Sequence, residues 1–190
     1  TSTCDRCHGR GQIVDTPCKT CDGKGKIRRQ KTIEISVPAG IDDDQILNVG
    51  GKGNAGSNGG PNGDLHVYIT VRPHAIFTRR GNDVWCDMPI TFTQAALGAE
   101  VTVPTLDGKV SYTVHEGTQP GDVFKLKGKG IQNINGRGRG DQYVRVTVEV
   151  PKNLSKRQKE LLQEFEQNAD EKNYQKRKSF FGKIKGMFED

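Results

Sequence analysis

Residues 63–71 read GDLHVYITV, and residues 140–148 read GDQYVRVTV. Apolar and polar residues alternate in both stretches and β-branched residues are frequent, which predicts a half-buried β-strand in each. Gly63 aligns with Gly140, and the same offset relates Val37–Gly53 to Val114–Gly130 without a gap. A constant offset over about 35 positions indicates an internal repeat and therefore two homologous β modules.

Each module is expected to contain a strand, a glycine-rich loop and a second strand. The first strands are predicted at residues 33–37 and 110–114, where β-branched or aromatic residues recur at every second position. Two more strands are predicted before the second copy, at 84–90 and 100–103. In the first copy a cysteine-rich segment takes their place. We therefore expect this segment to be an insertion in the first β domain, whose opening strands would precede Thr1.

Composition restricts the class of protein. The chain has 190 residues, 32% of them apolar, and a formal net charge of +6. No apolar run approaches the roughly 20 residues of a membrane-spanning helix, and no secretory signal segment is apparent. The sequence predicts a cytoplasmic protein that does not bind membranes.

Four of the five cysteines lie near the start of the chain and form the unit C-x-x-C-x-G-x-G twice. The pairs are Cys4 with Cys7 and Cys18 with Cys21. Two thiolates three positions apart can bind one metal ion from a tight turn, and the glycines let backbone N–H groups approach the sulfurs. Zinc is the favoured interpretation, with structural disulfides or a redox-active C-x-x-C as alternatives. Cys86 stands alone and is expected to be a small buried hydrophobe.

Helix is predicted only near the end of the chain. Ser155 and Gln158 form an S-x-x-Q capping box, and the helix that follows is expected to end near residue 168. Its apolar face carries three residues: Leu161, Leu162 and Phe165.

A second amphipathic stretch follows, with apolar residues at 180, 181, 184, 187 and 188. It is predicted to form a helix of about nine residues, which is marginal in isolation. Docking on the domain or on a partner subunit is therefore favoured over binding to a membrane surface.

The paired cysteine units, followed by Val37-Pro38-Ala39-Gly40-Ile41, resemble the C-terminal part of bacterial DnaJ co-chaperones. Further matching stretches are 63–65 (GDL), 72–77 (RPHAIF), 95–98 (AALG), 103–108 (VPTLDG), 127–130 (KGKG) and 178–181 (KSFF). The resemblance implies a mainly β chain with two homologous sandwich- or barrel-like domains in tandem, a zinc segment at the N-terminus and a C-terminal helix.

The implied organisation has five parts. Residues 1–29 would be the C-terminal half of the zinc module, 30–72 the rest of the first, client-binding β domain, and 73–152 the second β domain. Residues 153–169 would form the dimerisation helix, through Leu161, Leu162 and Phe165, and residues 170–190 a polar tail with the short amphipathic helix.

The chain departs from the family pattern in two respects. It has no His-Pro-Asp motif, by which the family's J domain stimulates the partner ATPase. The family also has four cysteine units that hold two zinc ions, the first unit paired with the fourth and the second with the third. The resemblance implies that Cys4 and Cys7 form half of one zinc site and Cys18 and Cys21 half of the other. Alternatively, the four thiolates collect a single zinc ion.

The resemblance also implies partners and a binding function without catalysis. Unfolded polypeptides would bind at Ile33, Ile35, Val67 and Ile69, and the complete protein would deliver them to a DnaK-type ATPase. These alternating residues could equally be ordinary core. A homodimer is implied as well.

Two other functions fit parts of the sequence. A zinc-ribbon nucleic-acid binder would use a group of cations: Lys125, Lys127, Lys129, Arg137 and Arg139. Aromatic residues make up only 6% of the chain, however, and no base-stacking series accompanies these charges. A thiol-disulfide oxidoreductase would use the C-x-x-C pairs.

Overall fold

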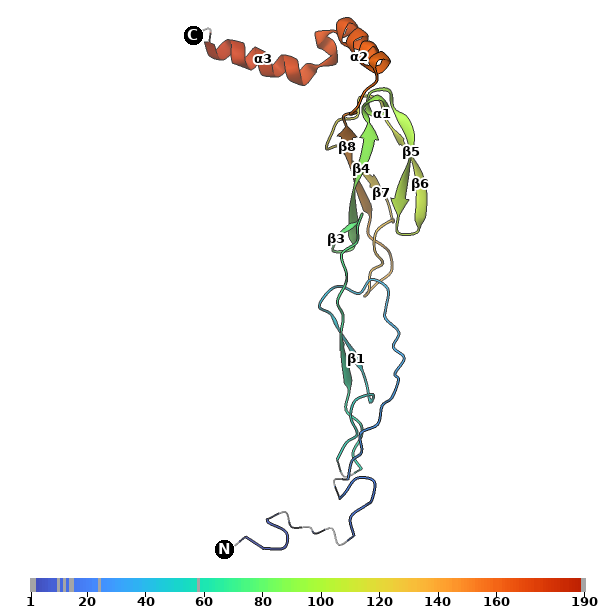
Figure 1. The fold of residues 1–190 in the computed structure, drawn as a ribbon, viewed down its shortest axis with the longest axis vertical. Helices are drawn as coiled ribbons and strands as arrows, with labels where there is room; N and C mark the ends of the chain where they lie inside the picture. Colours follow the sequence, from blue (N-terminus) through green and yellow to red (C-terminus); the bar gives the residue numbers. More distant parts are fainter. Residues whose placement is uncertain are drawn as a thin grey trace. The chain divides into compact units, whose positions relative to one another are not determined.

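The computed structural model describes residues 3–9, 11, 13, 16–23, 25–57 and 59–188, without the side chains of 185–188. The chain divides into two compact units, residues 1–71 and residues 72–190. Figure 1 shows the strands and helices of both units. Strands outnumber helices, as expected for a mainly β chain.

The first unit contains two antiparallel strands, β1 (Ile46–Val49) and β2 (Leu65–Tyr68), in which Leu47 lies opposite Val67. Pairing continues beyond β2, because the Ile69 N–H donates to the Gln45 carbonyl at 2.9 Å. The glycine-rich loop between the strands is closed by the Asp64 carboxylate, which accepts the Gly51 N–H at 2.9 Å.

The strand predicted at residues 33–37 is wrong: no strand is present between residues 26 and 38. Alternation of apolar residues is present there, but a strand also needs a hydrogen-bonded neighbour. Within the described residues, the strands of the first unit pair only with each other, as β1 with β2.

The second unit contains most of the regular structure. Its strands and first helix are β3 (Thr78–Arg80), β4 (Asp83–Thr91), α1 (Phe92–Leu97), β5 (Ala99–Thr105), β6 (Gly108–Val114), β7 (Val123–Leu126) and β8 (Gln142–Glu149). One sheet has the order β3-β4-β8-β7, with β4 and β8 parallel, and β5 pairs with β6 in a separate hairpin. The strands predicted around 84–90 and 100–103 are thus confirmed.

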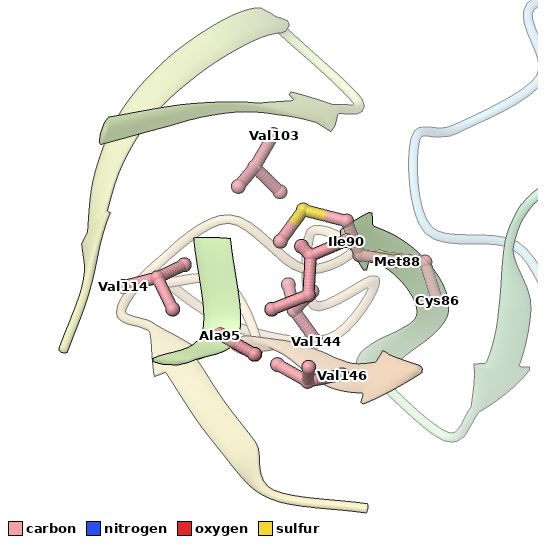
Figure 2. Close-up of a cluster of buried hydrophobic side chains, with 8 residues drawn as sticks. All are labelled: Cys86, Met88, Ile90, Ala95, Val103, Val114, Val144 and Val146. Atoms are coloured by element: carbon pink, nitrogen blue, oxygen red, sulfur yellow. The ribbon is translucent and has the colours of Figure 1, made fainter. Parts of the chain in front are cut away.

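The core of the second unit lies between these two sheets. Figure 2 shows its eight buried side chains: Cys86, Met88 and Ile90 from β4, Ala95 from α1, Val103 from β5, Val114 from β6, and Val144 and Val146 from β8. Cys86 is 5% exposed, which confirms its predicted burial, and that burial raises the pKa of its thiol.

The sequence repeat is confirmed by the backbone pairing. Strands β7 and β8 follow β1 and β2 at the offset of the repeat and have the same register: Phe124 lies opposite Val144, as Leu47 lies opposite Val67. The loop closure recurs too, because the Asp141 carboxylate accepts the Gly128 N–H at 2.7 Å. The repeat therefore specifies a strand pair together with its loop.

The C-terminal segment is helical. Helix α2 spans Lys156–Asn168 and begins with the predicted capping box, in which Ser155 and Gln158 each bond the other's backbone N–H. A short 3-10 helix, η1 (Glu171–Asn173), leads to α3 (Gln175–Phe188). Helix α3 has 14 residues and is longer than predicted. Over the described residues, no helix has the length and apolarity needed to cross a membrane.

We predict that Gly140→Ala destabilises the second unit by about 2 kcal/mol or more, because an added Cβ would overlap the Asn82 carbonyl oxygen. Thermal unfolding followed by Trp85 fluorescence measures this directly, since Trp85 is the only tryptophan in the chain. Gly136→Ala is the matched control, because the nearest atom to its added Cβ is the Asn133 side-chain nitrogen at 3.4 Å. Equal unfolding temperatures for the two variants would contradict the packing described.

Candidate functional site

The two cysteine units adopt the same backbone turn. The His8 N–H donates to the Cys4 carbonyl at 2.8 Å, and the Asp22 N–H donates to the Cys18 carbonyl at 2.8 Å. His8 and Asp22 have φ values of 48° and 51°, in the left-handed region that few non-glycine residues adopt. Because one uncommon turn occurs at both copies of the unit, the motif itself determines the conformation. We call each turn a knuckle.

The turn places backbone N–H groups on the first sulfur of each knuckle. In the second knuckle, hydrogen bonds from the backbone of Thr20 and Cys21 lower the pKa of Cys18 to about 7. In the first knuckle, those from Cys7 and Arg6 lower the pKa of Cys4. Because a thiolate is the form that binds metal ions, each knuckle is prepared for metal binding near neutral pH.

Each knuckle supplies two ligands. All four cysteines are free thiols in the structure. Within the described part of the chain, no three Cys, His, Asp or Glu side chains lie close enough together to hold a metal ion. A tetrahedral zinc site needs four ligands, so a knuckle alone provides half of one.

The four apolar residues predicted to bind polypeptide lie in two segments of the first unit, and all are half-buried. Val67 lies on β2 and Ile69 follows on the same face of the strand. Ile33 and Ile35 lie in the irregular segment 26–38. The structure therefore places Val67 on β2 and Ile69 directly after it, and it does not pair Ile33 and Ile35 with β2.

Strand β8 is the equivalent of β2 in the repeat, and the apolar faces of the two strands differ in burial. Val144 and Val146, the equivalents of Val67 and Ile69, are 0% and 2% exposed. They are covered because β8 lies between β4 and β7, with α1, β5 and β6 packed on its apolar face. Over the described residues, β2 pairs with β1 alone. Among the described residues, the same apolar pattern is therefore fully buried in the second unit and only partly buried in the first.

A hollow that the sequence analysis missed lies between β6 and β7, with a volume of about 280 Å³. The rings of Tyr112 and Phe124 line it, stacked at 3.7 Å, together with Val146. Under the offset of the repeat these positions correspond to Ile35, Leu47 and Ile69. The repeat could have indicated this hollow, because two of the three equivalent residues, Ile35 and Ile69, were already candidates for polypeptide binding.

Three of the five cations considered for nucleic-acid binding form ion pairs within the second unit. Arg139 donates two bonds to the Asp107 carboxylate, at 2.9 and 2.8 Å, and Lys129 lies 3.7 Å from the same group. The Arg139 side chain lowers the pKa of Asp107. Lys125 pairs with Asp141 at 3.2 Å. Pairing of these three cations within the fold weakens the nucleic-acid interpretation.

The apolar stripe of α2 is accessible. Leu161, Leu162 and Phe165 are 48%, 38% and 47% exposed, respectively. Phe165 meets Phe92 of α1 edge-to-face, with ring centroids 6.1 Å apart. The helix therefore has one aromatic contact with its own unit and an apolar surface available for another.

Comparison with known proteins agrees with the fold. The family model of the DnaJ C terminal domain matches residues 6–151, and that of the chaperone protein DnaJ C-terminal region matches residues 157–190. Relatives called "Chaperone protein DnaJ" include those of Ruminiclostridium cellulolyticum, 58% identical over 188 residues, and Acetivibrio thermocellus, 54% identical over 183. These alignments cover 99% and 96% of this chain, but 50% and 47% of the relatives.

The chain thus spans about half the length of the curated relatives it matches. The two family models together take in the second knuckle, both strand pairs of the repeat and the C-terminal helices. With more than half of its residues matched by the first model alone, the chain belongs to the DnaJ C-terminal domain family.

Proposed function

We propose that this chain is the polypeptide-binding part of a DnaJ-type co-chaperone, which binds unfolded proteins and delivers them to a DnaK-type ATPase. One observation carries the proposal. Val67, on β2, and Ile69, directly after it, are partly exposed, whereas their equivalents Val144 and Val146 are buried. Partly accessible apolar side chains along a strand can contact the apolar side chains of a transiently bound chain.

The chemistry of an unfolded chain fits this face. Such a chain exposes apolar side chains together with unpaired backbone N–H and C=O groups. The side chains of Val67 and Ile69 offer contacts to the apolar groups of such a chain. Over the described residues, segment 31–37 and the edge of β2 that faces away from β1 have no strand partner, so they offer hydrogen bonds to its backbone.

Binding of this kind requires no catalytic group. His74 accepts the N–H groups of Ile76 and Phe77 through Nδ1, at 3.1 and 3.3 Å, so it stabilises a turn. The low pKa of Cys18 suits a redox thiol as well as a metal ligand, but the curated relatives are named as chaperones. We place the protein in the cytoplasm.

We propose further that the knuckles bind zinc as halves of two different sites. Two thiolates with backbone N–H donors are a soft, negatively charged ligand pair, which suits Zn²⁺. Cys4 and Cys7 would hold one ion and Cys18 and Cys21 the other, with the remaining ligands supplied by cysteines elsewhere in the complete protein. Bound zinc would fix each turn and stabilise the segment that leads to residues 26–38.

Replacing an apolar residue of this face by a charge should weaken client binding. We expect Ile33→Asp and Val67→Asp in the full-length protein each to raise the dissociation constant for a permanently unfolded, carboxymethylated protein about tenfold. Fluorescence anisotropy of the labelled client measures the change. Ser36→Asp and Thr70→Asp, at exposed neighbouring positions, add the same charge and should have little effect. Unchanged affinity in both apolar variants would refute the assignment.

Zinc analysis of the full-length protein distinguishes two half-sites from one shared site. We expect two zinc ions per chain by mass spectrometry of the metal, and about one after Cys4→Ser with Cys7→Ser or after Cys18→Ser with Cys21→Ser. Cys86→Ala, which removes the buried thiol, should leave the count unchanged. A protein that loses all its zinc when either knuckle is removed would contradict the two-site arrangement.

We propose that the apolar stripe of α2 packs against the same stripe of a second copy. A double variant, Leu161→Asp with Phe165→Asp, should convert the dimer to a monomer, because two charges would be buried without partners. Sedimentation velocity reports the change in mass. Gln163→Asp, on the same helix, should leave the dimer intact. Persistence of the dimer in the double variant would exclude this role.

A further inference from the structure

Helix α3 has a composition unlike the rest of the chain. Its 14 residues contain five cations and no acidic residue: Lys176, Arg177, Lys178, Lys183 and Lys185. The sequence predicts a helix of about nine residues here, which would be marginal alone and would favour docking over a membrane surface. In the structure the helix is longer than nine residues, since α3 continues from Gln175 to Phe188, and this objection to membrane binding no longer applies.

Apolar residues gather on one face of this helix. At about 100° per residue, Phe180 and Ile184 point to one side and Phe181 lies beside them. Arg177 lies at the N-terminal end of the same face, where it pairs with Glu166 at 3.8 Å. The apolar face is therefore formed by the part of the helix that follows the first turn.

Lysines border this face on both sides. Lys176 and Lys183 run along one border, and Lys178 lies along the other. The opposite side carries uncharged residues, Ser179 and Gly182 among them. Lysines at both edges of an apolar face are typical of helices that lie in a lipid–water boundary, because the stems lie along the apolar region and the ammonium groups reach the headgroups.

The aromatic residues of this face are accessible. Phe180 and Phe181 are 60% and 57% exposed, and their rings meet edge-to-face with centroids 5.5 Å apart. Two ion pairs connect α3 to the preceding segments, that of Arg177 with Glu166 and that of Lys178 with Glu171, at 3.6 Å. Both pairs are long and all four side chains are largely exposed, so these pairs oppose rearrangement only weakly.

We infer that α3 binds the surface of an anionic phospholipid bilayer, lying in the plane of the interface with Phe180 and Phe181 inserted below the headgroups. A 14-residue helix is about 21 Å long and cannot span a hydrocarbon core of about 30 Å, so the interfacial orientation is the one available. The cations select lipids of opposite charge.

A second copy of the chain is the competing occupant for this face. An acidic partner helix would be needed to match five cations. Helix α2 is not acidic, since Lys156, Arg157 and Lys159 offset its three glutamates. Glu166 and Glu171, moreover, already pair with α3 within the same chain. Charge complementarity therefore favours the lipid surface.

Sedimentation of the chain with lipid vesicles tests the inference. We expect the chain to bind vesicles of phosphatidylcholine mixed with phosphatidylglycerol, and to bind phosphatidylcholine alone at least tenfold more weakly. Raising the salt concentration should weaken binding to the mixed vesicles. Phe180→Ser with Phe181→Ser, and separately Lys176→Glu with Lys183→Glu, should each reduce that binding about tenfold or more.

Two controls separate α3 from other sources of lipid affinity. Lys156→Glu with Lys159→Glu makes the same charge change on α2 and should leave vesicle binding nearly unchanged. Val67→Asp, which alters the proposed polypeptide-binding face, should also leave it unchanged. The inference is overturned by equal binding to both kinds of vesicle, by no binding to either, or by α3 variants that bind as well as the unmodified chain. A phenylalanine variant that becomes monomeric while retaining vesicle binding would assign the face to a second copy instead.

Discussion

A β-strand with one apolar face leaves that face in water unless another part of the protein covers it, and exposed apolar surface is unfavourable by roughly 25 cal/mol per Å². The repeat in this chain contains the same strand pair twice, and the apolar face of the pair is buried to different extents in the two units. In the second unit, β4, α1 and the β5–β6 hairpin cover Val144 and Val146. In the first unit, the described residues leave Val67 and Ile69 only partly buried. Over the described residues, the two strand pairs therefore differ in the elements that pack on them, and the polypeptide-binding assignment rests on the partly exposed apolar residues of the first pair.

The two copies share the means by which each glycine-rich loop closes. Asp64 and Asp141 each accept a backbone N–H from the start of their loop, and a glycine-to-glycine backbone bond of 2.8 Å follows in both, from Gly53 to Gly63 and from Gly130 to Gly140. In the first unit, Lys26 also bonds the loop, at the Ala55 carbonyl and the Ser57 hydroxyl. This contact connects the segment that follows the knuckles to the strand pair. Metal binding at the knuckles would thereby restrict the same segment that carries Ile33 and Ile35.

Sequence reasoning succeeded where a short-range signal determines the structure. Alternating residues predicted β4, β5, β6 and β8, and the S-x-x-Q pattern predicted the start of α2 at Ser155. It failed at residues 33–37, because a strand depends on a hydrogen-bonded neighbour that no local pattern reveals. Burial was equally inaccessible: Val67 and Val144 occupy equivalent positions in similar sequences, yet only the second is covered. The Arg139–Asp107 pair joins residues 32 positions apart and depends on how the loops fold together.

Amide hydrogen exchange of the full-length protein, with and without an unfolded client, tests the central claim most directly. The account predicts that client binding slows exchange in residues 31–37 and 65–69 of the first unit. Exchange in the equivalent strand of the second unit, residues 142–146, should be unchanged, because that strand is already covered on both edges by β4 and β7. Slower exchange in β8 to the same extent as in β2, or no change in the first unit, would show that the accessible strand face is not where unfolded chains bind.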